Sequence, residues 1–457
     1  MFRTIIEPFR IKTVEPISIT TKSQRSKLLR QAHCNPFLLH SKDVIIDLLT
    51  DSGTSAMSMN QWSSIMLGDE SYAGASSWQK FEKAVHNLTT MLHVLPTHQG
   101  RAAERILYGH LGGKGKLFIS NTHFDTTRAN IEYSGAQAID CLTPEATDMN
   151  SDFHFKGNLD TDQLRKLIRQ FGRKNIAAII LTVTNNTGGG QPVSMQNAKE
   201  VRKICDEFGL LLVLDACRVA ENSYFIRHFE KGFEKKSYYA IAQQMCSLAD
   251  ACIMSTKKDG LANIGGFLAI KDDTLAAACT NLLIITEGFT TYGGLTGRDM
   301  EAIAIGLHEV FEDDYLNYRI KSTAYLGNHL HEIGIPLMHP IGGHAVYVDA
   351  KEFYPHIPVE NYPGQALVCE LYLEGGIRCV EIGSVMFGKY NRNGKLILAD
   401  KELVRLALPR RVYTQSHIDY VVEVFENVFK KRKKARGFTI TYEPEFLRHF
   451  TAHFRPV

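Results

Sequence analysis

Two stretches decide the fold of this chain: LLLVLDACR at residues 210–218 and ACIMSTKKDG at residues 251–260. Each opens with a short apolar run that lacks polar alternation, as expected of a strand covered on both faces in a parallel sheet. The first run ends at Asp215, and the second leads to Lys258. Because ligands bind beyond the carboxyl ends of strands in open α/β sheets, these two side chains are candidates for one site.

The pattern of short apolar runs extends N-terminal to these stretches and alternates with amphipathic segments. Residues 177–183 form a third uninterrupted apolar run, and residues 160–171 and 194–208 have the spacing of amphipathic helices. Alternation of buried strands with helices predicts an α/β domain with a mainly parallel sheet and right-handed crossovers. We expect this large domain to cover residues 51–315.

The C-terminal third has a different pattern. A glycine-marked strand is expected at residues 342–348, and apolar spacing predicts an amphipathic helix at residues 421–429. We expect residues 316–457 to form a smaller α+β domain. Residues 1–50, an N-terminal arm that leads to the apolar, strand-like run 44–49, are expected to join it.

Composition excludes several classes of protein. With 457 residues, 44% hydrophobic and 22% charged, the chain matches a globular protein. A net charge of +3 is too small to indicate nucleic acid or an anionic membrane as partner, and no apolar run is long enough for a membrane span. Nine cysteines without a C-x-x-C pair argue against a disulfide framework or a zinc ribbon. The opening residues lack the apolar core of a secretion signal, so we expect a cytoplasmic protein.

The residues at the two strand ends allow more than one interpretation. Asp215 could cap a helix beside an unrelated Arg218. Lys257 and Lys258 could lie in a solvated turn. Against the second alternative, Gly265–Gly266 precede the next apolar run, which indicates backbone that approaches another group closely.

A third segment supplies a candidate anion site. Residues 96–101, PTHQGR, form a polar loop that opens a predicted helix, where free backbone N–H groups and Arg101 could hold a phosphate. Pyridoxal 5′-phosphate (PLP) requires a lysine for its aldehyde, a carboxylate for its pyridine nitrogen and a phosphate-binding loop. Lys258, Asp215 and this loop could meet all three requirements.

Long motifs along the chain resemble those of the β-eliminating lyases. The resemblance covers residues 7–452 and rests on residues 7–11, 47–54, 68–74, 96–101, 189–194, 220–222, 292–295 and 409–410. It implies the aspartate-aminotransferase-like fold (fold type I of the PLP enzymes). It also implies PLP-dependent cleavage of an aromatic amino acid.

The resemblance assigns catalytic and cofactor-binding roles to particular residues. It makes Lys258 the Schiff-base lysine, Asp215 the partner of the pyridine nitrogen and Phe124 the ring stacked on the cofactor. Tyr72 matches a catalytic acid that acts across a subunit boundary. His449 is also expected to be a catalytic residue. The positions that match cofactor contacts are Gln99, Gly100, Arg101, Phe124, Asn186, Asp215, Arg218, Ser255, Lys257 and Lys258.

The resemblance also implies the substrate, cation and oligomer contacts. Arg405 matches the residue that holds the substrate α-carboxylate. The full set of matching substrate positions is Thr50, Ser52, Asp125, Asn186, Ile382, Arg405 and His449. A potassium ion is expected at Gly53, Glu70 and Asn263, in a homotetramer built as a dimer of dimers.

Three positions predict the leaving group. The tyrosine-cleaving members of the family carry an arginine where this chain has Ile382, an aromatic ring at His449 and a threonine at Asp125. A phenol hydroxyl facing Ile382 would lack a polar partner, whereas an indole presents an apolar face and one N–H donor. We therefore expect L-tryptophan to yield indole, pyruvate and ammonium.

Alternatives remain at this stage. His449 could be a structural histidine that packs a C-terminal lid. The enzyme could instead cleave L-tyrosine to phenol, pyruvate and ammonium. A nucleotide-dependent α/β enzyme would leave the pairing of Asp215 with Lys258 unexplained, and a non-enzymatic binding protein would use the basic run 430–436, which we interpret as a solvated helix end.

Overall fold

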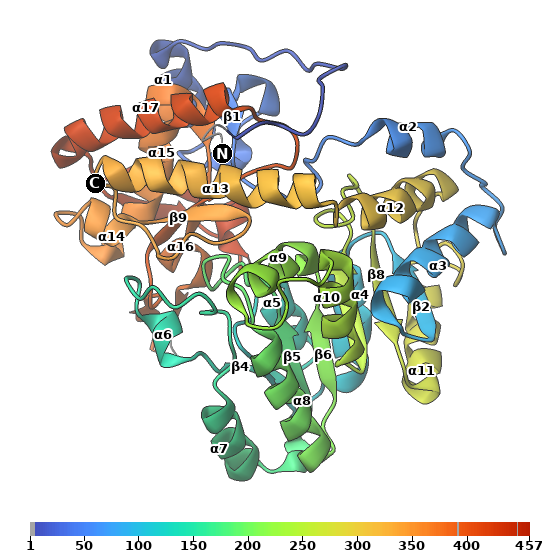
Figure 1. Cartoon of the computed structure of the whole chain (residues 1–457). Helices are drawn as coiled ribbons and strands as arrows, with labels where there is room; N and C mark the ends of the chain where they lie inside the picture. Colours follow the sequence, from blue (N-terminus) through green and yellow to red (C-terminus); the bar gives the residue numbers. More distant parts are fainter. Residues whose placement is uncertain (1–4, 391–392, 446) are drawn as a thin grey trace. The chain divides into compact units, whose positions relative to one another are not determined.

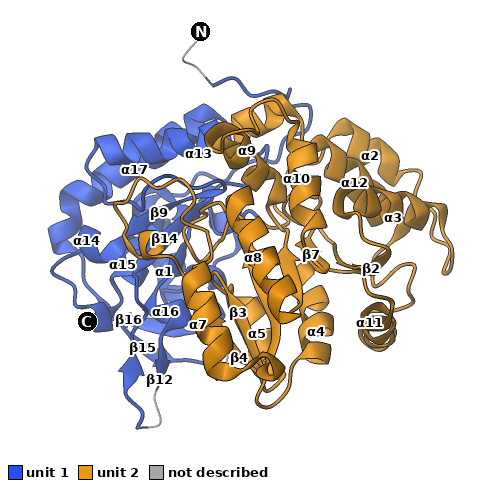
Figure 2. Ribbon diagram, turned by 60° about the horizontal axis from the view of Figure 1, so that its bottom comes forward, with its two compact units in different colours: residues 1–51, 321–457 blue, residues 52–320 orange. Residues whose placement is uncertain are grey.

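The computed structural model describes residues 5–390, 393–445 and 447–457 (Figure 1). The chain divides into two units, residues 1–51 with 321–457 and residues 52–320, which Figure 2 colours separately. Each unit has a hydrophobic core of its own. Among the described residues, no helix combines the length and apolar character needed to cross a membrane.

A seven-stranded sheet forms the centre of residues 52–320. Its strand order is β2-β8-β7-β6-β5-β3-β4, and all neighbours are parallel except that β8 runs antiparallel to β7 and β2. The strands are β2 His93–Thr97, β3 Leu117–Ser120, β4 Gln137–Asp140, β5 Ile176–Thr182, β6 Leu212–Asp215, β7 Ala251–Ser255 and β8 Gly266–Ile270. The three apolar runs of the sequence are thus confirmed as the neighbouring strands β5, β6 and β7.

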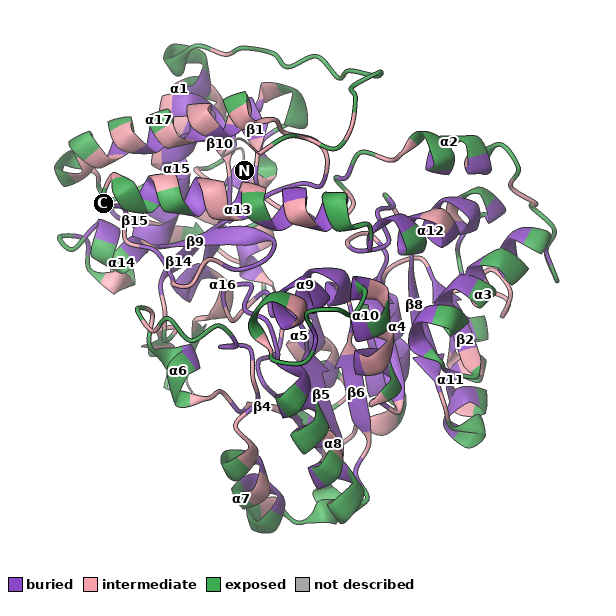
Figure 3. Ribbon diagram, viewed as in Figure 1, coloured by how far each residue is buried: buried purple, intermediate pink, exposed green. Residues whose placement is uncertain are grey.

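Helices cover both faces of this sheet because its strands alternate apolar side chains between two cores. In β5, Ile179 and Leu181 join one core while Ala178 and Ile180 join the other. Strands β5 and β6 are buried along most of their length (Figure 3). The helices of this unit are α2 Met59–Ile65, α3 Ser76–Thr89, α4 Gly100–Leu111, α5 Asp125–Tyr133, α6 Pro144–Thr147, α7 Thr161–Phe171, α8 Met195–Phe208, α9 Val219–Phe229, α10 Tyr238–Ser247, α11 Asp273–Thr286 and α12 Gly297–Glu309, with the 3-10 turn η3 Arg173–Asn175.

The other unit is α+β, as its sequence pattern predicts. Its main sheet is antiparallel, in the order β11-β14-β9, and helices α15 and α17 pack in its core. The strands are β1 Ile46–Asp47, β9 Ala345–Asp349, β10 Ile377–Arg378, β11 Val380–Ile382, β12 Lys389–Tyr390, β13 Leu396–Ile397, β14 Leu403–Ala407, β15 Phe438–Tyr442 and β16 His453–Pro456. The helices are α1 Lys22–Gln31, α14 Ala350–Phe353, α15 Pro363–Gly375, α16 Ser384–Phe387 and α17 Gln415–Lys431, with the 3-10 turns η1 Pro36–Leu38, η2 Ser41–Asp43, η4 Val359–Asn361, η5 Arg432–Lys434 and η6 Arg448–Phe450; α13, Asp313–Glu332, continues from one unit into the other.

One expected strand is shorter than its apolar run. Within residues 44–49, β1 covers two residues, and it pairs in parallel with β10. The Asp47 carboxylate accepts a hydrogen bond from the Leu49 backbone N–H at 3.1 Å, which turns the chain after the strand. The apolar side chains Ile46 and Leu48 are buried all the same. Burial without strand pairing explains why the hydrophobic pattern overestimates the strand.

Candidate active site

The loop after β7 carries the candidate catalytic lysine and is fixed from several directions. The Lys258 backbone N–H donates to the Ser255 carbonyl at 3.2 Å, and that of Thr256 donates to the Gly265 carbonyl at 3.1 Å. The Asp259 carboxylate accepts the Ala220 N–H of α9 at 2.7 Å. These bonds connect the loop to the strand and helix beside it, so the backbone of the lysine is held in one place.

Asp215 and Lys258 both influence Cys217, which lies between the ends of β6 and β7. The Asp215 carboxylate accepts the Cys217 N–H at 3.1 Å, and the Cys217 sulfur accepts the Ser255 N–H, also at 3.1 Å. Burial and the Asp215 charge raise the pKa of the Cys217 thiol to about 12, while the Lys258 charge lowers it. The structure therefore brings the two side chains into one electrostatic environment at adjacent strand ends, as the sequence predicts.

A buried carboxyl that the sequence analysis missed lies in the same environment. Glu104 of α4 is 7% exposed, and burial with the Asp215 charge raises its pKa to about 7 against the opposing Lys258 charge. The hydroxyls of Thr126 and Thr127, in the first turn of α5, donate to its carboxyl, the former at 3.0 Å. A charged residue on the apolar face of an amphipathic helix was the available sequence signal.

The predicted anion loop lies at the start of α4, where close backbone approach requires glycine. A Cβ on Gly100 would lie 2.7 Å from the Ser255 Cβ, and one on Gly266 would lie 2.7 Å from the Gln99 carbonyl carbon. Gln99 caps the helix, so the following N–H groups point out from its first turn. This arrangement suits a phosphate.

Positive charge gathers beside this helix start. Burial lowers the pKa of the Lys257 ammonium, and the charges of Lys258 and Arg101 lower it further. Three cations that act on one another at a helix N-terminus form an electrostatic environment that a doubly charged anion would stabilise.

Phe124 and Asp125 begin α5. Phe124 caps the helix with extended backbone, and the Asp125 carboxylate accepts the Thr126 N–H at 2.6 Å. The Asp125 side chain is buried. The Glu104 bonds to the first turn of α5 hold both residues in position.

Asn186 and Arg218 are both buried, which is consistent with a site rather than a surface. Thr184 has a positive φ of 48° and its hydroxyl donates to the Arg218 carbonyl at 3.0 Å. The Asn186 carbonyl accepts the Gly189 N–H at 3.4 Å. The loop after β5 is therefore connected to the residue that opens α9.

Two of the three expected cation ligands lie together. The Asn263 amide donates to the Gly53 carbonyl at 3.0 Å, and the Gly53 N–H donates to the Lys257 carbonyl at 2.7 Å. Glu70 instead accepts from the Gly297 N–H at 3.0 Å and from the Arg298 guanidinium at 2.9 Å, at the start of α12. Across residues 5–390, 393–445 and 447–457, no cluster of three or more His, Cys, Asp or Glu side chains could hold a metal ion.

Ser52 and Tyr72 complete the candidates in residues 52–320. Ser52 directly precedes Gly53 and is partly buried. Tyr72 is 68% exposed, with its ring stacked on Phe289 at 5.5 Å and edge-on to Tyr292 at 5.2 Å. A tyrosine held by aromatic contacts, with most of its surface open, can be covered by another chain.

The remaining candidates belong to the unit of residues 1–51 and 321–457. Arg405 lies in β14, opposite Val380 of β11 and Tyr347 of β9. Its guanidinium donates to the Leu49 carbonyl at 2.8 Å, which places it beside Thr50. A buried guanidinium fixed by a backbone carbonyl is a suitable receptor for a carboxylate.

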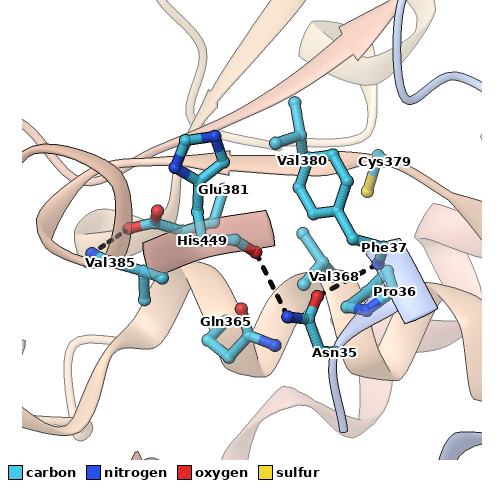
Figure 4. A pocket seen from close by; sticks show the side chains of 10 residues that line it. All are labelled: Asn35, Pro36, Phe37, Gln365, Val368, Cys379, Val380, Glu381, Val385 and His449. Atoms are coloured by element: carbon cyan, nitrogen blue, oxygen red, sulfur yellow. Dashed lines mark hydrogen bonds between the residues drawn. The ribbon is translucent and has the colours of Figure 1, made fainter. Parts of the chain in front are cut away.

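His449 lines a small pocket in this unit (Figure 4). Burial and the nearby charges of Arg405 and Arg448 lower the pKa of the imidazole to about 4. The Asn35 amide donates to the His449 carbonyl at 3.1 Å, and the Phe37 ring lies edge-on to the imidazole at 5.6 Å. The pocket is lined by Asn35, Pro36, Phe37, Gln365, Val368, Cys379, Val380, Glu381, Val385 and His449.

Ile382 ends β11, one residue after the pocket-lining Glu381, and it is buried. It pairs with Leu403 of β14, two residues from Arg405. Arg405 and Ile382 are therefore carried by neighbouring strands of one small sheet, and His449 lies in the turn η6 of the same unit.

A mainly parallel sheet with helices on both faces, and a lysine and an aspartate at adjacent strand ends, is characteristic of the aspartate-aminotransferase-like fold. Solved structures agree: a serine palmitoyltransferase of Sphingomonas wittichii has a TM-score of 0.60 at 12% identity, covering 90% of this chain and 97% of its own. Another from S. paucimobilis has a TM-score of 0.59 at 13% identity with the same coverage. The fold expected from the sequence is confirmed.

Sequence relatives define the family. The family described as Beta-eliminating lyase matches residues 47–424, and the chain belongs to it. A tryptophanase of Salinibacter ruber is 56% identical over 99% of this chain and 96% of its own length, and one of Hyphomonas neptunium is 52% identical over 99% of both. A tyrosine phenol-lyase of Symbiobacterium sp. is 46% identical over the whole of both chains.

Proposed function

We propose that this chain is a PLP-dependent carbon–carbon lyase that cleaves L-tryptophan to indole, pyruvate and ammonium. The observation that carries the proposal is that Asp215 ends β6 next to β7, whose following loop carries Lys258, with Cys217 hydrogen-bonded both to Asp215 and to Ser255 at the end of β7. The names of the relatives support it: the two relatives at 52% identity or more are tryptophanases, and the tyrosine phenol-lyase is less similar.

The residues present fit the cofactor. Because Gly100 has no side chain, the start of α4 lies directly beside Ser255, so the free backbone N–H groups of the helix and the Ser255 loop can contact one phosphate, and Lys257, Lys258 and Arg101 supply positive charge. Lys258 would hold the aldehyde carbon, Asp215 the pyridine nitrogen and Phe124 the ring face. When bound, PLP supplies an electron sink for the charge that develops at the substrate Cα.

Proton movements are then assigned to residues of this chain. Lys258 would remove the Cα proton, and the Asp215 carboxyl group would bind the pyridine nitrogen. The indole ring must gain a proton at carbon before it can leave, and Tyr72 is the proposed acid. Arg405, whose guanidinium donates to the carbonyl of Leu49 beside Thr50, holds the substrate α-carboxylate, with Thr50 and Ser52 as further proposed contacts.

The leaving group is selected by polarity. Because its pKa is about 4, His449 is neutral near pH 7 and can accept a hydrogen bond from an indole N–H. Asp125 offers a second acceptor, while Ile382 offers apolar contact alone. A phenol hydroxyl placed against Ile382 would be left without a partner, which costs about 1–3 kcal/mol.

Potassium, a homotetramer and a cytoplasmic location are parts of the same proposal. The Gly53 and Asn263 carbonyls supply hard oxygen ligands, and Glu70 a carboxylate, of the kind that alkali ions prefer. Oligomerisation is supported by exposed apolar side chains on and after α2: Met59, Trp62, Met66 and Leu67. The proposed catalytic role of the exposed Tyr72 likewise requires a neighbouring chain.

The cofactor assignment is tested by borohydride reduction of the purified protein. An internal imine absorbs near visible wavelengths, and reduction should bleach it and leave the pyridoxyl group on the peptide that contains Lys258. The K258A variant should lose the label and all turnover, while the K257A variant, its adjacent control, should keep the label. Labelling of Lys257 instead would contradict the assignment, and absence of any absorbance would favour a binding protein.

The substrate assignment is tested by comparing kcat/KM for L-tryptophan and L-tyrosine. We expect at least a tenfold preference for tryptophan, about 1.4 kcal/mol. The I382R variant, which introduces a donor for a phenol oxygen, should narrow the difference. A wild-type preference for tyrosine would establish the alternative activity and refute the interpretation of Ile382 and His449.

A further inference from the structure

The short helix α16, Ser384–Phe387, is held at its N-terminus by two buried carboxyl groups. Glu381 accepts the backbone N–H groups of Val385 at 3.0 Å and Met386 at 3.1 Å. Glu402 accepts the N–H of Ser384 at 3.1 Å and also its hydroxyl. These carboxyls attach the helix directly to β11 and to the residue before β14.

A buried arginine from the C-terminal segment binds the same helix. Arg448 is 7% exposed; its Nε donates to the Val385 carbonyl at 2.7 Å and its Nη2 to the Ser384 carbonyl. Its Nη1 pairs with Glu443 at 3.0 Å. Position 388 has no room for a side chain: a Cβ on Gly388 would overlap the Ser384 carbonyl oxygen and lie 2.6 Å from the Arg448 Nη2.

These contacts connect two candidate specificity residues that are distant in sequence. Ile382 lies two residues before α16, and His449 follows Arg448 in the turn η6. The guanidinium is planar and donates to two successive carbonyls, so it restrains both the distance and the orientation of η6 relative to α16. Replacing it would leave two buried carbonyls without these donors.

We propose that Arg448 is a positioning residue that fixes His449 relative to Ile382 and thereby sets selectivity for the aromatic leaving group. The inference rests on the proposed function, because it assumes that both residues face the departing indole. A substrate with a small leaving group does not need these contacts. Loss of Arg448 should therefore impair tryptophan cleavage far more than elimination of a small group.

The test compares kcat/KM for L-tryptophan with that for β-chloro-L-alanine, which releases chloride from the same Cβ. In the PLP-loaded R448M variant, we expect the ratio of the two values to fall at least tenfold. R432M is the matched control: Arg432 also donates to a helix-end carbonyl, that of Phe429 at 2.9 Å, and packs on the Phe429 ring, but it does so at the end of α17. Its ratio should stay within twofold of the wild type.

A second variant covers the case in which R448M fails to fold. R448K keeps a long cationic side chain at this position, but an ammonium lacks the planar fork that donates to two successive carbonyls, so it should lower the same ratio in the same direction. Equal losses for both substrates, or an unchanged ratio, in the variant that folds would overturn the positioning role. A wild-type protein that eliminates chloride but does not cleave tryptophan would refute the proposed function itself, which is a distinguishable result.

Discussion

Replacing Glu104 with Gln tests the environment behind the candidate cofactor site. The carboxyl has a pKa of about 7 in the folded chain against an ordinary value of 4.5. Because the folded pKa is raised, the unfolded chain releases this proton first, and stability is lost as the pH rises from 4.5 to 7. A difference of about 2.5 pKa units corresponds to about 3 kcal/mol. The group is fully buried, so solvent does not reduce this cost appreciably.

The E104Q amide is neutral at every pH and can still bond to the Thr126 and Thr127 hydroxyls, which rotate to suit. Thermal unfolding of the PLP-free protein should therefore show E104Q gaining about 2.5 kcal/mol on the wild type between pH 5 and pH 8, since part of the effect is already present at pH 5; this is roughly 5 °C for a domain of this size. E200Q, at an exposed position of α8, should gain nothing. An E104Q variant that is destabilised equally at both pH values would show that Glu104 is a satisfied carboxylate and refute the reasoning.

Three further predictions concern stability and ligand binding. R410M removes one partner of a buried ion pair, Arg410 with Asp51 at 3.0 Å, and should destabilise its unit by about 3–5 kcal/mol in denaturant unfolding; a loss under 1 kcal/mol would contradict this. G100A forces a methyl group to 2.7 Å from the Ser255 Cβ, and the resulting overpacking costs about 1–3 kcal/mol. This variant should therefore bind PLP about tenfold more weakly in a fluorescence titration. G109A is its control, because a methyl group at position 109 of the same helix meets open space, and it should bind PLP normally. Exchange of potassium for lithium should lower turnover several-fold, and equal rates in both salts would count against the cation site.

Local hydrophobic pattern was sufficient to predict the three central strands. A strand with an uninterrupted apolar run, such as the one ending at Asp215, has apolar side chains on both faces, so it must be buried between two layers of helices. The polar residue that ends such a run must then lie at an edge of the sheet. For this reason the sequence alone predicts that Asp215 and Lys258 lie at neighbouring strand ends, and the motif resemblance adds proposed roles for residues whose local pattern carries no signal.

Tertiary structure alone decided the strand order, the antiparallel direction of β8 and the contacts between segments distant in sequence. The sequence places Glu104 on the apolar face of an amphipathic helix, but its raised pKa depends on burial and on a strand end more than a hundred residues away. Arg448 likewise looks like a surface cation until its donors meet the carbonyls of α16. Burial and charge are properties of the assembled surroundings of a side chain, so they follow from packing and not from the order of residues along the chain.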